Sequence, residues 1–394
     1  MERGQPHGRQ SGLFLFHYAL AWAGGAIAYV PLLTLILPAF VSGLAGDEAV
    51  SWIATLAFVG AASASLCNIA FGWASDLTGR RRLWVAAGLV LSCALLVTID
   101  SARDLKGLTI AIIAWQLATN MMLAPLAAWA GDCVPDAQKG RLGGLLAFAP
   151  AMGALSGAII TWPGLVATEY RLSVVAAMVA ACVLPLIVFG RPRAFARLLQ
   201  DAPDRPARSP VAGMWLARLL LQISEAALFA FLLVWLQSLS PDFDESDAAL
   251  LFGAVVFAAI PLALAAGRWA DRASRPILPL IAATLVAALG LVIMAGAPTT
   301  TMAVLGYGLF GVAGAVFLAL HSAQTLRVLP RASRRGRDLG FFNLTNTIPA
   351  LVMPGIALSL VPVFGFAGLF AALAVLAVCA ALCLIGVMRW AQSP

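Results

Sequence analysis

The sequence contains few charged residues and lacks the residue spacings of an enzyme or a metal site. Of its 394 residues, 11% are charged and 62% are hydrophobic, whereas about a quarter of the residues in a soluble globular protein are charged. It shows no nucleophile–base pair and no cluster of metal ligands, and its six cysteines lie in or beside apolar runs. We therefore expect a polytopic membrane protein that is not an enzyme and that holds no metal and no cofactor.

A cleavable leader is missing as well. The polar residues 1–12 lead directly into a long apolar run without a small-residue cleavage site. We therefore expect this first run to be retained as a transmembrane helix.

Twelve apolar runs are long enough to cross a bilayer core of roughly 30 Å, which requires about 20 residues per helix. They cover residues 13–37, 48–73, 82–100, 108–131, 142–166, 171–190, 211–238, 247–269, 276–297, 300–326, 338–362 and 364–389. We predict an all-α membrane protein with twelve transmembrane helices. The polar segment 191–210 divides it into an N-terminal six-helix half at 1–190 and a C-terminal six-helix half at 211–394.

The basic residues predict the orientation in the membrane. Most Lys and Arg lie in alternate loops, such as 80–82 and 327–337, whereas the intervening loop at 240–247 is acidic. Because cytoplasmic loops carry an excess of Lys and Arg, we predict that both termini and the 191–210 linker face the cytoplasm of a cell (inner) membrane. The net charge of +7 is accounted for by these loops, so we expect a lipid-embedded monomer that does not bind nucleic acid.

Two segments repeat at a constant offset. "GWASDLTGRRR" begins at Gly72 and "GRWADRASR" begins at Gly267, so that Asp76 and Asp271 are also 195 residues apart. Pro135 and Pro330 have the same separation. Internal repeats are typical of transporter folds, and we predict that the two halves are six-helix pseudo-repeats.

The first of these segments resembles the signature of the major facilitator superfamily, G-x-x-x-D-[RK]-x-G-[RK]-[RK]. Gly72, Asp76, Gly79 and Arg80–Arg81 fit it, while Leu77 replaces the usual basic residue. The segment with Asp271 and Arg272 fits the weaker second copy.

This resemblance implies two six-helix halves that rock around a central site, and a cytoplasmic gate at these loops. Asp76 would accept backbone N–H bonds at the start of the eleventh span, where the helix dipole favours negative charge. The other interpretation is that the loops only follow the charge bias of cytoplasmic segments, particularly at Arg80–Arg82.

The segment "GRDLGFFNLTNTIPALVMPGI" at 336–356 is similar to the corresponding junction in sucrose-carrier-like and glycoside–pentoside–hexuronide symporters. That resemblance implies a sugar or glycoside as solute. The second and fourth spans lack the carboxylates of sodium-coupled melibiose-type carriers, which disfavours sodium coupling. The fourth span also lacks the arginine of drug–proton antiporters, which weakens an assignment as a multidrug exporter.

Polar side chains inside the spans are candidates for solute binding, because such groups face a bundle interior or an aqueous pathway. Trp115 beside Gln116 and Asn120 offers an aromatic surface with amide groups, which suits a sugar ring. The other candidates are Tyr18, Trp22, Gln222 and Asn346. Trp and Tyr also anchor helices at membrane interfaces, and amides also bridge packed helices, so both roles remain open.

The seventh span carries two charges. Arg218, Gln222 and Glu225 are spaced four and three residues apart and therefore share one helix face. At 1.5 Å per residue, Arg218 lies about 10 Å and Glu225 about 21 Å from residue 211, so that only Arg218 can reach the near interface. Burial disfavours an ionised carboxyl group, and Glu225 is the main candidate for a coupling proton, with His17 and His321 as secondary candidates. The structural alternative is a bridge from Glu225 to Arg218 or Gln222.

These expectations combine into a secondary active transporter that works by alternating access. We expect proton-coupled symport of a small polar organic solute, with a sugar or glycoside as the first candidate. A proton-driven exporter of an amphipathic compound is the first alternative, and a transport-inactive scaffold or cofactor-delivery protein is the second.

Overall fold

The structure is a computed structural model that describes residues 8–162, 164–195, 198, 210–240, 242–243, 245–272, 275–329 and 332–392. All secondary structure in these ranges is helical, which confirms the predicted all-α class. The α-helices are α1 (Gly12–Pro31), α2 (Leu37–Ala45), α3 (Ala49–Thr78), α4 (Arg81–Leu96), α5 (Leu105–Cys133), α6 (Lys139–Leu146), α7 (Phe148–Thr161), α8 (Arg171–Phe189), α10 (Val211–Leu239), α11 (Glu245–Arg272), α12 (Leu278–Ala295), α13 (Thr300–Val328) and α14 (Arg335–Gln392).

In the described ranges, eleven helical segments are long and apolar enough to cross a membrane. Most bounds follow the predicted runs closely; α5, for example, covers Leu105–Cys133 where 108–131 was predicted. The predicted count of twelve differs from this count at the C-terminal end. The predicted runs 338–362 and 364–389 correspond to two helices that meet at a kink and together carry the label α14.

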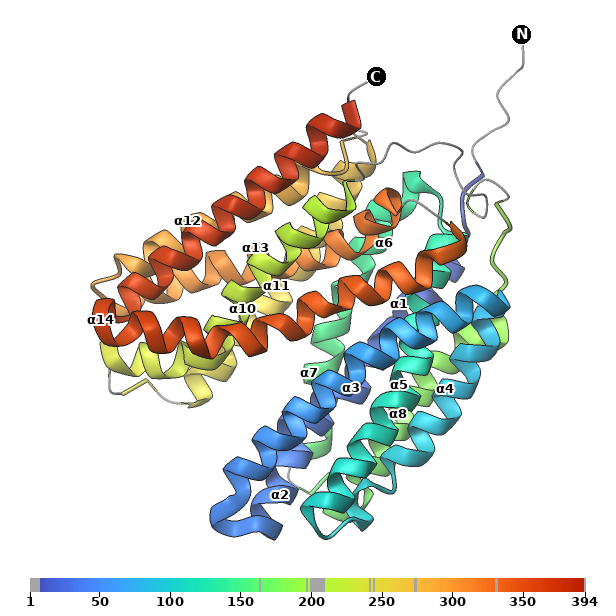
Figure 1. The fold of residues 1–394 in the computed structure, drawn as a ribbon, viewed down its shortest axis with the longest axis horizontal. Coiled ribbons are helices and arrows are strands. Elements are labelled where there is room, and N and C mark those ends of the chain that lie inside the picture. The colour runs from blue at the N-terminus through green and yellow to red at the C-terminus, as the bar shows by residue number, and fades with distance from the viewer. Residues whose placement is uncertain are drawn as a thin grey trace. The chain divides into compact units, whose positions relative to one another are not determined.

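The helix α14 has one interruption, at Gly365. Its backbone angles there are φ 65° and ψ −170°, a combination that essentially only glycine adopts. The helix therefore consists of two arms that meet at a bend, drawn in orange and red in Figure 1. This bend lies within three residues of the end of the predicted run 338–362, so the two arms correspond to the last two predicted runs.

The contacts of the chain define two compact units. Unit 1 consists of Met1–Pro135, Phe148–Ala202 and Arg331–Asn343, and unit 2 consists of Asp136–Ala147, Pro203–Pro330 and Leu344–Pro394. Each sequence half thus contributes one short segment to the unit that holds most of the other half. The predicted division at 191–210 stays a prediction, and most of that linker lies outside the described residues.

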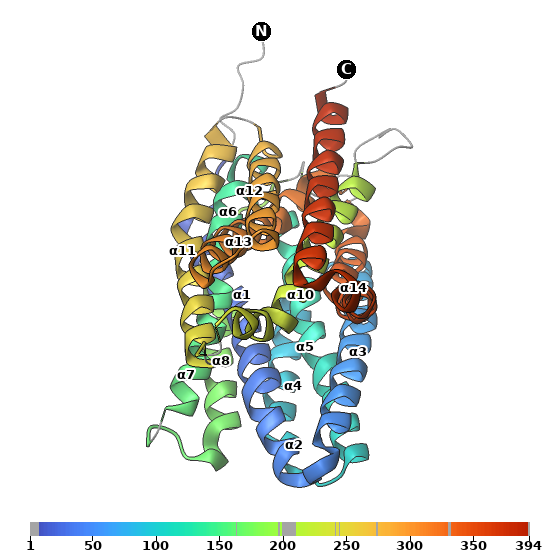
Figure 2. The ribbon, with the colours of Figure 1, turned by 90° about the vertical axis from the view of Figure 1, so that its left-hand side faces the viewer.

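In unit 1, α5 packs between α3 and α4, and α1 packs against α7 and α8, as the two views of the ribbon also show (Figures 1 and 2). Small residues permit close packing here: a Cβ on Gly88 of α4 would strike the backbone of Met122 in α5. Large side chains such as Trp115 and Tyr18 are buried in this unit. It is these packed helices that hold the polar side chains of the spans in place.

In unit 2, α12 packs against α13, and the short helix α6 packs on both α11 and α13. The predicted fifth span is divided at this point. Its first part forms α6 in unit 2, whereas α7, which follows after Ala147, belongs to unit 1.

Candidate functional site

In unit 1, Asp76 near the end of α3 accepts backbone N–H bonds from the first turn of α14. The donors are Gly336 and Arg337, both at 2.9 Å, and the Asp76 side chain is 1% exposed. A carboxylate at a helix N-terminus satisfies N–H groups that have no partner within the helix and interacts favourably with the helix dipole. This is the geometry that the resemblance implied for Asp76.

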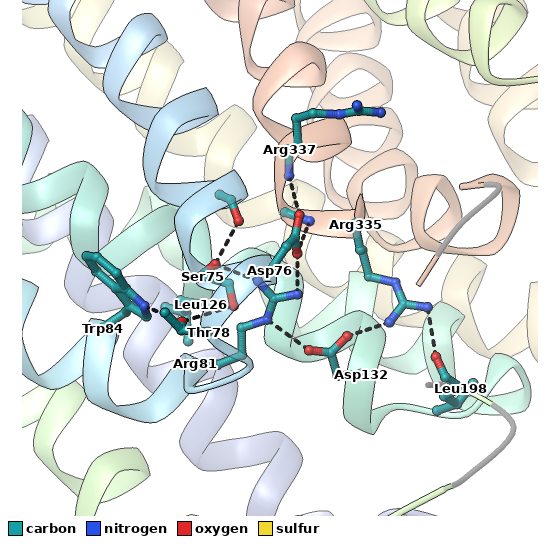
Figure 3. A network of polar contacts seen from close by, with 12 residues as sticks. Ser75, Asp76, Thr78, Arg81, Trp84, Leu126, Asp132, Leu198, Arg335 and Arg337 are labelled. Carbon is teal, nitrogen blue, oxygen red and sulfur yellow. Dashed lines mark hydrogen bonds and ion pairs between the residues drawn. The ribbon is translucent and has the colours of Figure 1, made fainter. Parts of the chain in front are cut away.

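A chain of alternating charges extends from this contact (Figure 3). Arg81 at the start of α4 bonds Asp76 at 2.6 Å and Asp132 of α5 at 3.0 Å, and Asp132 also pairs with Arg335 at the start of α14. Two acids and two bases neutralise one another, which offsets the cost of removing each from water. The roles of Asp132 and Arg335 were not predicted, although Arg335 directly precedes the segment 336–356.

Unit 2 contains a second copy of the same contact. Asp271 at the end of α11 accepts N–H bonds from Gly140 at 2.9 Å and Arg141 at 2.8 Å, in the first turn of α6. Arg327 of α13 pairs with Asp271 at 3.1 Å. The sequence repeat at 195 residues therefore corresponds to a repeated contact, in which an aspartate accepts N–H bonds from the first turn of a helix.

Glycine pairs bring the helices close at both contacts. A Cβ on Gly72 would strike the carbonyl of Gly336, and a Cβ on Gly336 would strike the carbonyl of Gly72. Gly267 and Gly140 stand in the same reciprocal relation in unit 2. The glycines of the repeated motif are needed because any side chain would separate the two backbones.

The remaining residues of the predicted gate lie at the surface. Gly79 ends α3 in a left-handed conformation, with φ 64°, and Arg80 precedes α4. Arg80 and Arg272, the last residue of α11, are exposed. These positions shape and charge the loops, and they make no contribution to the Asp76 and Asp271 contacts.

A polar cluster joins three helices of unit 1. Tyr29 of α1 donates its hydroxyl hydrogen to Gln116 of α5, and Asn120 of α5 donates to the Tyr29 oxygen at 3.0 Å. Asn68 of α3 donates to the side-chain oxygen of Asn120 at 3.0 Å. The candidates Gln116 and Asn120 thus lie in one hydrogen-bonded cluster, to which the structure adds Asn68 and Tyr29.

The aromatic candidates of unit 1 are more deeply placed than expected. Trp115 is fully buried, packs edge-on against Tyr29 with ring centroids 5.1 Å apart, and its indole N–H has no hydrogen-bond partner. Tyr18 is buried and donates to the carbonyl of Leu126 at 3.0 Å, and it stacks with the half-buried Trp22 at 6.5 Å. Of these three, only Trp22 is partly accessible in this structure.

A second polar cluster, in unit 2, is built on α10. Arg218 donates through Nε to Gln222 at 3.0 Å, through Nη1 to Ser322 of α13 at 3.2 Å and through Nη2 to Asn346 of α14 at 3.2 Å. Gln222 donates to the same Asn346 oxygen at 2.7 Å. Gln222 and Asn346 are therefore brought together as predicted. Ser322 was missed because one serine beside His321 gives no signal of its own.

Glu225 takes no part in this network. It lies on the same α10 face as Arg218, and its charge interacts with Arg218 and with Tyr307 of α13. Within the described residues, however, it forms no hydrogen bond, and no ion pair joins it to Arg218. The bridge from Glu225 to Arg218 or Gln222, the structural alternative, is not formed here.

The two histidine candidates occupy different surroundings. His321 of α13 is fully buried, with Nε2 at 3.0 Å from the carbonyl of Met214 and Nδ1 at 3.2 Å from the Thr325 hydroxyl. A carbonyl can only accept, so Nε2 carries the hydrogen and Nδ1 accepts from Thr325. His17 of α1 packs beside Phe16 and Phe189, which are 57% and 67% exposed.

Comparison with known proteins agrees with this architecture. The family model of the Major Facilitator Superfamily matches residues 214–394. Among solved structures, the human organic anion transporter MFSD10 (TETRAN) superimposes with a TM-score of 0.77 at 15% identity, covering 94% of this chain and 99% of that one.

Two further structures show the same fold. The proton:xylose symporter XylE gives a TM-score of 0.74 at 13% identity, with 94% of each chain covered. A bacterial homologue of the iron transporter ferroportin, in an outward-facing state, gives 0.73 at 15% identity and covers 97% of this chain and 99% of that one. No curated protein matches the sequence significantly.

The chain is an integral membrane protein with the major facilitator fold. The family match and the fold support its membership of the superfamily, and they point to a transporter rather than an enzyme. The structural neighbours differ in what they transport, and none of the matches singles out the sucrose-carrier-like or glycoside–pentoside–hexuronide branch.

Proposed function

We propose that this protein is a secondary active transporter that couples the movement of a small polar organic solute to the movement of protons. Sugars and glycosides are the first candidates, from the resemblance of residues 336–356 to the corresponding junction of sugar symporters. In this proposal Glu225 carries the coupling proton, and the polar clusters on the spans contribute the solute-binding groups. Both termini face the cytoplasm of a cell membrane.

The coupling proposal rests on the position of the Glu225 carboxyl group inside a span and on its lack of hydrogen bonds in the described residues. It is the one acidic residue within α10 (Val211–Leu239), and within the described residues it has no hydrogen-bond partner. A carboxyl group inside a membrane span is costly to keep charged and is a functional site by default. Because no hydrogen bond from the described residues holds its proton, Glu225 can exchange a proton with water as access to the site changes.

The two polar clusters support the solute-binding part of the proposal. Gln116, Asn120 and Tyr29 in unit 1 and Gln222 and Asn346 in unit 2 are amide and hydroxyl groups that can exchange hydrogen bonds with a hydroxylated solute. The buried indole N–H of Trp115 has no acceptor among the residues that the structure describes. A solute hydroxyl or a water molecule would supply one, since buried donors are nearly always paired.

The paired Asp76 and Asp271 contacts fit a gate on the cytoplasmic side. In each, a carboxylate holds the first turn of a helix that comes from the other sequence half. Alternating access in this fold requires such contacts to break and re-form, since the halves rock against each other. We propose that Asp76, with Arg81, and Asp271, with Arg327, hold the gate shut in one of the two states.

The test is transport in proteoliposomes with a panel of neutral and charged solutes, with and without an inward proton gradient. Wild type is expected to accumulate at least one solute against its gradient when the gradient is imposed. Glu225→Gln is expected to lose this accumulation while it retains counterflow of the same solute, because exchange needs no net proton movement.

Glu169→Gln is the matched control, because Glu169 is exposed in a short 3-10 turn between α7 and α8. It should accumulate solute as wild type does. If Glu225→Gln also accumulates solute as wild type does, Glu225 is not the coupling residue. If no solute responds to the proton gradient in wild type, proton coupling itself is wrong.

A further inference from the structure

The Arg218 cluster in unit 2 holds a positive charge that forms no ion pair with a carboxylate in the described residues. Arg218 is half-buried on α10, and its three bonded partners are the side-chain oxygens of Gln222, Ser322 and Asn346, all neutral. No acidic side chain lies within ion-pair distance of Arg218 in the described residues. Glu225 on the same helix face interacts with Arg218 through its charge but forms no ion pair with it. An arginine inside a span without an ion-paired carboxylate is expensive to maintain.

Three other arginines in or near the spans differ from Arg218, because each forms an ion pair with a carboxylate. Arg81 and Arg335 bond Asp132, and Arg327 bonds Asp271. The chain therefore supplies carboxylates where an arginine serves to join helices. At Arg218 it supplies neutral oxygen atoms instead, which orient the guanidinium group without neutralising it.

The donor count leaves room for a ligand. A guanidinium group has five N–H bonds, and the bonds of Arg218 use one on Nε, one on Nη1 and one on Nη2. One N–H therefore remains on each terminal nitrogen. Two N–H groups of one guanidinium are the number that a carboxylate accepts in the paired arrangement typical of arginine recognition.

The cluster is also accessible. Asn346 is exposed and Arg218 and Gln222 are partly exposed in unit 2. Polar groups within a span face the bundle interior or an aqueous pathway rather than lipid, and the exposure of Asn346 favours the pathway. A solute in that pathway can reach the two remaining N–H groups.

We propose that Arg218, held by Gln222, Ser322 and Asn346, binds a carboxylate of the transported solute, so that the solute is a small organic anion. This inference rests on the proposed transport function and names the substrate class of the same site. A single carboxylate matches the single charge of Arg218, whereas a phosphate ester would bring a second negative charge without a partner. Ser322 and Asn346 act as positioning residues for the guanidinium group.

The experiment measures ligand-dependent thermal stabilisation of the purified protein in detergent, which needs no proton gradient. The probes are matched by shape: D-glucose, D-glucuronate and D-glucose 6-phosphate form one set, and benzyl alcohol and benzoate form another. Wild type is expected to be stabilised by at least one carboxylate and not by its neutral match. Arg218→Gln should raise the half-saturating concentration of that carboxylate at least about tenfold, because bonds to charged groups contribute roughly 1.5–3 kcal/mol.

Two further variants keep the test decisive if Arg218→Gln folds poorly. Arg218→Lys keeps the charge but loses the paired donors, so it should still prefer the carboxylate over the neutral match, with weaker binding. Ser322→Ala removes one neutral partner and should weaken binding less than Arg218→Gln does.

The proposal is overturned if no carboxylate stabilises wild type more than its neutral match. It is also overturned if Arg218→Gln leaves the half-saturating concentration unchanged, or if glucose 6-phosphate binds as well as glucuronate does. Carboxylate binding that depends on Arg218 without proton-driven accumulation would support this inference and contradict proton coupling. Proton-driven accumulation of neutral solutes, without binding of any carboxylate, would support proton coupling and contradict this inference.

Discussion

Glu225 and His321 are both ionisable side chains inside the spans of unit 2, yet their partners differ. Both ring nitrogens of His321 are hydrogen-bonded within the protein, to Met214 and Thr325. Glu225 has no such bond in the described residues. A group whose hydrogen bonds are all formed within the protein is suited to joining helices, whereas an unbonded carboxyl group is suited to exchanging a proton.

This difference predicts opposite phenotypes for the two residues. His321→Ala should lower the stability by roughly 1–3 kcal/mol, because the Met214 carbonyl and the Thr325 hydroxyl lose a buried partner. The dependence of transport on external pH should stay as in wild type. The measurements are the melting temperature in detergent and the pH profile of solute uptake, with Glu225→Gln as the reference. A flattened pH profile in His321→Ala would assign the proton to the histidine instead.

For individual residues, the types and spacing in the sequence predicted which side chains share a helix face. They did not predict which of these side chains form hydrogen bonds with one another. The spacing placed Arg218, Gln222 and Glu225 on one face of a helix, and the structure retains that face. The choice of Asn346 and Ser322 over Glu225 as partners of Arg218 depends on how α13 and α14 pack against α10. Tyr29 was not among the candidates for the same reason, because its partners Gln116 and Asn120 come from a distant helix.

Among the elements, the contact between α11 and α6 depends on the absence of a side chain. A Cβ on Gly267 would strike the carbonyl of Gly140, whereas Gly253, on the same helix α11, has open space around its position. Gly267→Ala should therefore destabilise the protein by about 1–3 kcal/mol, which is typical of overpacking. Gly253→Ala should be neutral or stabilising by up to about 1 kcal/mol, since alanine favours a helix more than glycine does.

The melting temperatures of the two variants test this prediction, and the transport rate of Gly267→Ala tests whether the contact matters for function. Equal melting temperatures for Gly267→Ala and Gly253→Ala would show that the α6 and α11 backbones separate without cost. The pair isolates the contact, because both changes add the same methyl group to the same helix.

Helix positions were the most predictable part of the fold, because long apolar runs in a membrane protein have few alternatives to a spanning helix. The bounds of α5, α8, α10 and α13 agree with the predicted runs to within a few residues. The predicted boundary at 362–364 lies beside the kink at Gly365. The runs did not predict the turn at Ala147 between α6 and α7, or that these two parts of the fifth span pack in different units. Hydropathy does not register either event, since both sides of the break are equally apolar.

For the whole molecule, the two Asp contacts are separate copies that share no residue. Asp76 acts in unit 1 and Asp271 acts in unit 2. Asp76→Asn and Asp271→Asn should each lower stability, because the amide keeps one acceptor but loses the charge that its arginine partner requires.

The double variant Asp76→Asn/Asp271→Asn should show the sum of the two single losses, within roughly 0.5 kcal/mol, since independent sites are additive. Denaturant or thermal unfolding of the three variants in the same detergent provides the measurement. A double variant that loses clearly more or clearly less than the sum would mean that the two contacts are energetically coupled.

The repeat at 195 residues predicted this duplication, and a resemblance to known transporters predicted the partner of Asp76. The exchange of segments between the units was not predicted, because the sequence halves were divided at the 191–210 linker. Residues 136–147 and 331–343 pack with helices that lie far from them in the sequence, and neither composition nor hydropathy distinguishes them from the spans that they begin.

The exchanged segments also determine when folding can finish during synthesis. Unit 1 includes Arg331–Asn343, so its Asp76 contact forms only after about nine-tenths of the chain has been made. Residues 136–147 emerge early from the ribosome, but their packing partners α11 and α13 follow more than a hundred residues later. The first six predicted spans therefore enter the membrane before residues 331–343 are available to complete unit 1. At that stage residues 136–147 still lack their packing partners α11 and α13. Neither unit is completed on its own; both units are finished late in translation.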